Sequence, residues 1–111
     1  MEKINGGVTA PEGFFATGIA AGLKKDGSKD LAIVCSEDSA ATAAVFTTNK
    51  VKGHSLQLTM EHIKNGYANA IIINSGSANA CIGDQGYEDA KEICTIAAEL
   101  LDCSPDQVLV G

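Results

Sequence analysis

The pattern of hydrophobic and polar positions in the first half of the chain predicts a pair of strands. Apolar runs at residues 13–20 and 31–35 have the length of strands, and the Asp26-Gly27 pair between them is a strong hairpin signal. The second run has no polar break, which is typical of a strand covered on both faces. Residues 39–46 stay ambiguous between helix and strand, because alanines give way there to β-branched and aromatic residues.

The second half of the chain predicts further strands and a short helix. Residues 54–58 alternate weakly, as an edge strand does. Thr59 is suited to cap a short helix that runs to Lys64, with a glycine just past its end. Residues 68–73 predict a buried strand and residues 107–110 a final one.

A long helix is predicted between these last two strands. Asp84 or Gln85 can begin it, and the Pro105 region ends it. Its apolar residues recur at steps of three and four and therefore share one face: Tyr87, Ala90, Ile93, Cys94, Ala97, Leu100 and Leu101. The expected fold class is α/β, a mixed sheet with covering helices.

The extent and composition of the chain limit its class. With 111 residues it holds one domain at most, and its last residue, Gly111, directly follows a predicted strand. We therefore expect residues 1–111 to be a single segment of a longer polypeptide whose domain continues after Gly111. A net charge of −6 and a pI near 4.7 argue against nucleic-acid binding. No apolar stretch suits a membrane span or a signal segment, so a cytoplasmic location is expected.

The cysteines and histidines give no metal-site pattern. The four cysteines include no Cys-x-x-Cys pair, and without a signal segment they are expected to be reduced and mostly buried thiols. The two histidines, His54 and His62, are expected as solvated surface side chains, because neither belongs to a recognisable arrangement with a hydroxyl group.

The densest cluster of small and polar residues lies at positions 74–86, between a predicted strand and the long helix. Two interpretations are open. The segment could line or support a ligand pocket, since ligands gather at strand ends in α/β folds, or it could be a tight turn whose Asn and Ser side chains bond local backbone groups. Residues 83–86 could also cradle a phosphate, although they lack the usual Gly-rich patterns.

The same cluster carries a family resemblance. Its pattern Asn-Ser-Gly-x-Ala-Asn-Ala-Cys-x-Gly-x-Gln-Gly, at residues 74–86, resembles a signature of the ornithine acetyltransferases, the glutamate N-acetyltransferases of arginine biosynthesis. Residues 7–14, with 20–24 after them, resemble the opening of that family, and residues 40–49 resemble its third block. These blocks occur in the right order and span nearly the whole chain.

The resemblance implies an activity whose reacting groups lie elsewhere. Members of the family cut their own precursor before a threonine, giving α and β chains. That threonine then carries the acetyl group from N-acetylornithine to glutamate, and some members also accept acetyl-coenzyme A. Both the nucleophilic threonine and an oxyanion-hole Thr-Gly pair are expected beyond Gly111. No metal or bound cofactor is implied.

For the 111 residues themselves, the resemblance implies the N-terminal part of an α chain with no catalytic residue of its own. Its partners would be the rest of the α chain and the β chain, in a heterotetramer, and the segment alone is expected to be inactive. Four residues are candidates for supporting the pocket: Asn74, Ser75, Gly76 and Asn79. Two alternatives stay open, a non-catalytic binding or structural module and a small nucleotide-binding domain that uses residues Gly83 to Gly86.

Overall fold

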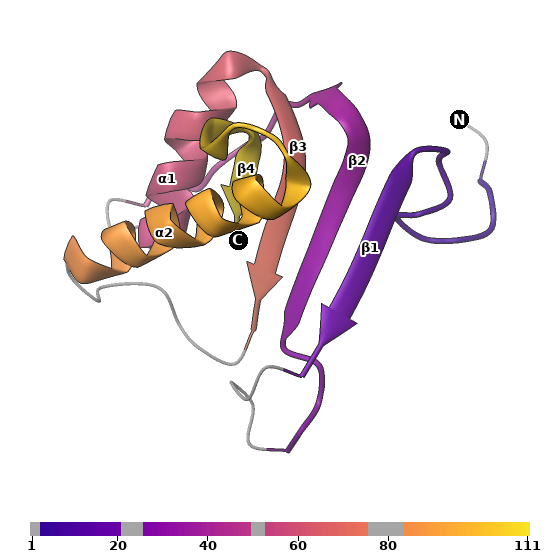
Figure 1. The fold of residues 1–111 in the computed structure, drawn as a ribbon, viewed down its shortest axis with the longest axis horizontal. Coiled ribbons are helices and arrows are strands. Elements are labelled where there is room, and N and C mark those ends of the chain that lie inside the picture. Colours follow the sequence, from indigo (N-terminus) through magenta and orange to yellow (C-terminus); the bar gives the residue numbers. More distant parts are fainter. Residues whose placement is uncertain (1–2, 21–25, 50–52, 76–83) are drawn as a thin grey trace.

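The computed structural model describes residues 3–20, 26–49, 53–75 and 84–111, and these form one sheet with helices on it (Figure 1). The strands lie in the order β1-β2-β3-β4. The first three are antiparallel neighbours, and β3 and β4 are parallel. The elements in chain order are β1 (Phe14–Ile19), β2 (Leu31–Ala41), α1 (His54–His62), η1 (Ile63–Asn65), β3 (Tyr67–Asn74), α2 (Asp84–Leu101), η2 (Pro105–Gln107) and β4 (Val108–Val110). The expected mixed α/β sheet is confirmed.

The β1–β2 hairpin forms as predicted, and β2 extends further than expected. The register pairs Phe15 with Cys35 and Ile19 with Leu31. An irregularity between Cys35 and Ala40 shifts the pairing of β2 with β3, and the strand then continues to Ala41. The ambiguous stretch thus begins as strand and is irregular from residue 42 to 49.

The edge strand predicted at residues 54–58 was wrong, because these residues form the first half of helix α1, whereas the helix predicted to run to Lys64 is confirmed in the second half of α1 and in η1. Thr59 lies inside this helix and does not cap it. Leu58 is buried in the core at 1% exposure and Thr59 bonds the neighbouring strand. Packing of one helix face therefore outweighs a weak alternating pattern. The predicted glycine stop is confirmed at Gly66, which ends η1 with φ of 78°.

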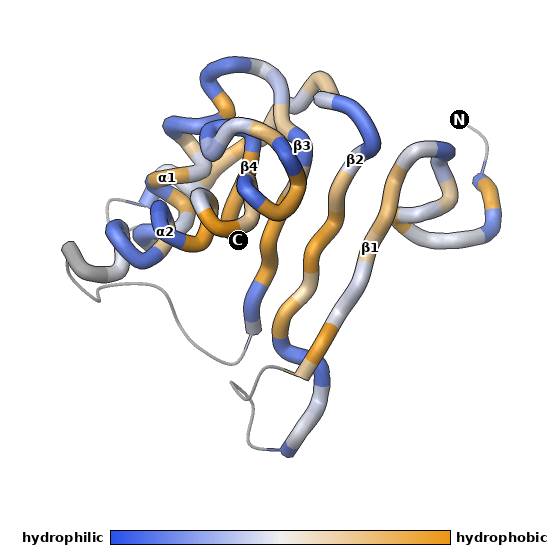
Figure 2. The backbone as a smooth tube through the Cα atoms, in the orientation of Figure 1, coloured by the Kyte–Doolittle hydropathy of each residue, from blue (hydrophilic) through white to orange (hydrophobic). Residues whose placement is uncertain are grey.

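The core lies between one face of the sheet and both helices. Alternate residues of β3 are buried, as a strand with one covered face requires. In Figure 2, the hydrophobic (orange) stretches of β3, β4 and α2 lie close to one another. The buried cluster consists of Leu58, Ile72, Ala90, Cys94, Ala97, Ala98, Val108 and Val110. Small side chains dominate it, as the scarcity of aromatic residues predicts.

Two expectations about burial are corrected. The run Leu31–Cys35 is half-buried throughout and not covered on both faces. On α2, the predicted apolar face is buried at its alanines and at Cys94, whereas Ile93 and Leu100 are exposed. Both departures occur where the helices leave part of the sheet uncovered, so the sequence carries more apolar surface than these elements bury.

The outer edge of β4 is closed by side chains of α1. The Thr59 hydroxyl donates to the Val110 carbonyl at 2.7 Å and accepts from the Val110 N–H at 2.9 Å. One turn further along, the Nδ1 atom of His62 lies 2.8 Å from the carbonyl oxygen of Val108. α1 thus satisfies backbone groups that a free strand edge would expose. His62 is therefore half-buried and hydrogen-bonded, which corrects the prediction of a solvated histidine.

Candidate functional site

The carboxyl end of β3 is the point at which three segments of the chain meet. The Gly111 N–H donates to the Ile72 carbonyl at 2.8 Å, and the Asn74 N–H donates to the Gly111 carbonyl at 3.1 Å. The Ser75 N–H then donates to the carbonyl of Asp30, just before β2, at 2.9 Å. Asn74 and Ser75 therefore hold the ends of β3 and β4 and the start of β2 in one place.

A groove with a volume of about 520 Å³ opens beside Asn74, between the sheet and α2. Its floor comes from β2, β3 and β4, and one wall comes from α2. Most of its lining is aliphatic. Polar side chains reach it from the start of α1, the end of β3 and the first half of α2, namely His54, Ser55, Asn74 and Asp89. An apolar groove with a few polar groups is the usual form of a small-molecule or peptide site.

His54 is the polar group at this groove that sequence reasoning misjudged. It was expected on a solvated edge strand, but it is half-buried at the start of α1. Its Nδ1 atom is buried without a hydrogen-bond partner among the described residues. The spacing of His54, Leu58 and His62, each four residues apart, is the helical signal that would have placed it correctly.

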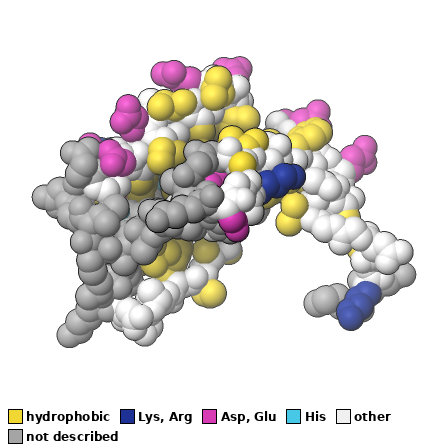
Figure 3. All heavy atoms as spheres, turned by 90° about the horizontal axis from the view of Figure 1, so that it is seen from below, with side chains coloured by type: hydrophobic (Ala, Val, Ile, Leu, Met, Phe, Trp, Pro, Cys, Tyr) yellow, Lys and Arg dark blue, Asp and Glu magenta, His cyan; other side chains and the backbone are white. Residues whose placement is uncertain are grey.

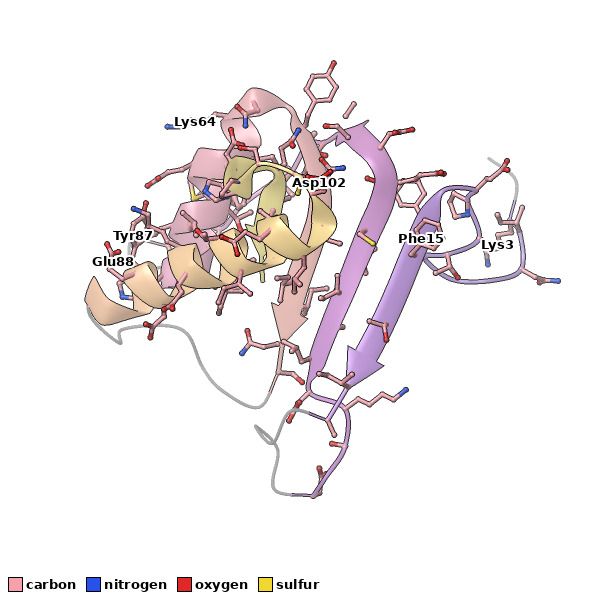
Figure 4. All side chains as sticks on the ribbon, viewed as in Figure 1. Lys3, Phe15, Lys64, Tyr87, Glu88 and Asp102 are labelled. Atoms are coloured by element: carbon pink, nitrogen blue, oxygen red, sulfur yellow. The ribbon has the colours of Figure 1, made fainter. Side chains whose placement is uncertain are left out.

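A hydrogen bond fixes α2 against α1 close to His54. The Tyr87 hydroxyl donates to Oε2 of Glu61 at 2.7 Å. Tyr87 is labelled in Figure 4, in the first turn of α2 facing α1. The hydrogen bond to the Glu61 carboxylate raises the pKa of Tyr87, because ionisation of the phenol would place two negative charges together. Tyr87 therefore acts as a neutral donor that joins the two helices.

The structure describes three of the four cysteines. Cys35, Cys94 and Cys103 are free thiols, as predicted, while Cys81 lies outside the described residues. Burial raises the pKa of the Cys94 thiol to about 11, which keeps it protonated and unreactive near neutral pH. Within the described ranges, no group of three or more His, Cys, Asp or Glu side chains could hold a metal ion. Across the same residues, no helix has the length and apolarity needed to cross a membrane.

The four predicted pocket residues divide into two pairs. Asn74 lines the groove and Ser75 follows it directly. Gly76 and Asn79 lie outside the described residues, as does Gly83 of the possible phosphate cradle. Gly86, at the other end of that cradle, is buried in the first turn of α2 and lines the groove.

Comparison with known proteins identifies the family. The model of the ArgJ family matches residues 15–111. The chain belongs to the ArgJ family. It is 49% identical over 110 residues to the arginine biosynthesis bifunctional protein ArgJ of Caldanaerobacter subterraneus, and 48% identical over 99 residues to that of Geobacter sulfurreducens. These matches cover 99% and 89% of this chain but 27% and 25% of the relatives, so it spans about a quarter of their length.

Solved ArgJ structures have the same fold. The arginine biosynthesis bifunctional protein of Bacillus halodurans matches with a TM-score of 0.90 at 42% identity, over 95% of this chain and 55% of that one. An ornithine acetyltransferase of Mycobacterium tuberculosis, solved in complex with ornithine, matches with a TM-score of 0.87 at 43% identity. This second match covers 94% of the present chain and 57% of the other. The family resemblance carried by the 74–86 block is thereby confirmed.

Proposed function

We propose that these 111 residues form part of an acetyltransferase that moves an acetyl group from N-acetylornithine to glutamate. The support is the family membership together with the likeness to a structure named for ornithine acetyltransferase and solved with ornithine. The transfer would proceed through an acetyl-threonine enzyme, with the threonine supplied by another part of the protein, which cuts its own precursor. Acetyl-coenzyme A could serve as a second donor, in keeping with the word bifunctional in the names of the relatives.

Within that enzyme, we infer that the segment supports the pocket and does not carry out the chemistry. The observation behind this role is the pair of hydrogen bonds that fixes Gly111 beside Ile72 and Asn74. In the family, the oxyanion segment follows the strand that corresponds to β4. It would therefore start next to Asn74, at the polar end of the groove. Asn74 and Ser75, together with Gly76 and Asn79, would position that segment without touching the reacting atoms.

The proposed partners are the remaining parts of an ArgJ polypeptide, its α and β chains, assembled as a heterotetramer. This chain spans only 27% and 25% of the length of two relatives, which supports a role as one part of a larger enzyme. The 111 residues alone should then give no acetyl transfer from N-acetylornithine to glutamate. Turnover that persists in the purified segment, and that scales with its concentration, would contradict this account.

A hybrid protein tests the proposal in cells. It consists of the Caldanaerobacter relative with the stretch that aligns to this chain replaced by these 111 residues, a region of 49% identity. Expressed in a bacterium that lacks its own acetyltransferase of this step, the hybrid should restore growth without arginine. A hybrid in which Leu58→Asp disrupts the core is the negative control. Failure of the unaltered hybrid, at an expression level at which the parent protein restores growth, would count against the proposed function.

A further inference from the structure

Among the described residues, the helices cover only half of the sheet on the side that carries them. α1 and α2 lie over β3 and β4, whereas no described helix lies over β1 and β2 (Figure 1). On this side β1 presents Phe15 and Ile19, which are 56% and 52% exposed. Their cross-strand partners on β2, Cys35 and Leu31, share the same face and are half-buried.

This surface continues into the groove described above. Leu31 and Ile33 of β2 form part of its floor, and Ile93, Ile96 and Leu100 of α2 form part of its wall. The last three side chains are all exposed, Leu100 at 82%. The described residues thus form an apolar surface that runs from the groove beside α2 across β2 to β1. A surface of this kind on a soluble domain marks an interaction site.

The dimensions of the surface suit one helix. Neighbouring strands lie about 4.8 Å apart, so β1 and β2 together span about 10 Å. Packed helices lie about 8–10 Å apart, so the width of β1 and β2 matches that of a single helix packed beside α2. Glu92 and Glu99 lie on α2 one turn to either side of Ile96, which lines the groove, so this part of α2 carries negative charge. Seen from below, hydrophobic side chains lie next to a row of acidic ones (Figure 3).

We propose that this surface binds an amphipathic helix from the part of the ArgJ polypeptide that lies outside these 111 residues. The relatives contain further polypeptide that could provide this helix. The segment covers only 27% of the Caldanaerobacter protein and 55% of the Bacillus halodurans structure. The apolar face of the helix meets Phe15, Ile33 and Ile96, and basic residues on its flank face the acids of α2. The inference rests on the proposed role as part of a larger enzyme, and it names the surface through which the segment joins it.

Matched substitutions in two proteins test the proposal. Phe15→Glu and Ile96→Glu are made in the isolated 111-residue chain and in the hybrid protein. In the isolated chain both side chains are exposed, so each change should leave the melting temperature within about 1–2 °C of the unsubstituted chain. In the hybrid they would lie beneath the bound helix, so each should lower the melting temperature by about 5 °C or more. Val45 is 97% exposed and does not line the groove, so Val45→Glu should leave the melting temperature of both proteins unchanged.

Each alternative outcome is distinguishable. Equal effects of Phe15→Glu and Ile96→Glu in the two proteins would show that nothing covers the groove and would overturn the proposal. So would a hybrid that fails to fold under conditions in which the parent folds. Light scattering could instead show that the isolated chain is a dimer and that Ile96→Glu converts it to a monomer. The surface would then bind a second copy of the chain, and the proposal would again be overturned. Acetyl transfer by the hybrid is measured separately, so loss of activity with the expected stability pattern would refute only the proposed function.

Discussion

Single side chains of α1 determine how the last strand is held. Thr59 is buried, and its hydroxyl group both donates to and accepts from the backbone of Val110. A buried backbone group that loses its partner costs more than the hydrogen bond itself contributed, because water cannot replace the partner. Thr59 is therefore a structural residue.

Replacing Thr59 with valine keeps the shape of the side chain and removes both hydrogen bonds. We expect Thr59→Val to lower the free energy of unfolding by about 2 kcal/mol, since the N–H and carbonyl of Val110 are left unpaired. Thr95→Val is the matched control, because Thr95 is an exposed helical threonine that bonds only the Lys91 carbonyl. Urea denaturation of the two variants measures the difference. Equal losses of stability would show that the Thr59 contacts contribute nothing specific.

The pKa of Cys94 leads to a prediction about reactivity. Burial raises it to about 11 from the ordinary value of 9.0, so the folded protein favours the neutral thiol. The contribution of this group to stability is complete below pH 9 and is lost as the pH rises toward 11. Iodoacetamide at a pH near 9 should therefore label half-buried Cys35 well before Cys94 in the folded chain. Mass spectrometry gives the order, and equal labelling rates would contradict the assigned burial.

At the scale of elements, the predictions that succeeded rested on strong local patterns. The β1–β2 hairpin has an Asp-Gly pair between its two strands, and α2 has apolar residues at helical steps from Tyr87 to Leu101. The prediction failed for the first half of α1, a nine-residue helix that includes only one fully buried large side chain, Leu58. A helix this short is stabilised by packing against β4 and α2, and such contacts are absent from the local sequence.

The packing of α1 predicts a large effect of truncating Leu58. Leu58→Ala should lower the free energy of unfolding by about 3 kcal/mol, because a fully buried leucine leaves a cavity between α1 and the sheet. Leu100→Ala on α2 removes the same atoms from a largely exposed position and should cost less than about 0.5 kcal/mol in the isolated chain. Chemical denaturation of both variants compares them. A small effect at Leu58 would mean that α1 does not hold the core together.

At the scale of the whole molecule, the sequence located one part of the candidate site and could not locate the rest. The 74–86 block was singled out because its small polar residues follow a predicted buried strand, and two of its described residues, Asn74 and Gly86, line the groove. Its contact with Gly111 and Asp30 could not be predicted, since it depends on the parallel placement of β4 beside β3. The groove was also not predictable. It arises because α2 and the sheet leave apolar surface uncovered, which is a property of their relative placement.

The proposed role of this chain is to work as part of an acetyltransferase of the ArgJ family. The most direct test is acetyl transfer from N-acetylornithine to glutamate by the purified hybrid protein, with the Caldanaerobacter parent and the isolated 111-residue chain assayed beside it. The account predicts a kcat/KM for the hybrid within about tenfold of the parent, and no turnover by the isolated chain. A folded hybrid without measurable transfer, under conditions in which the parent is active, would contradict it.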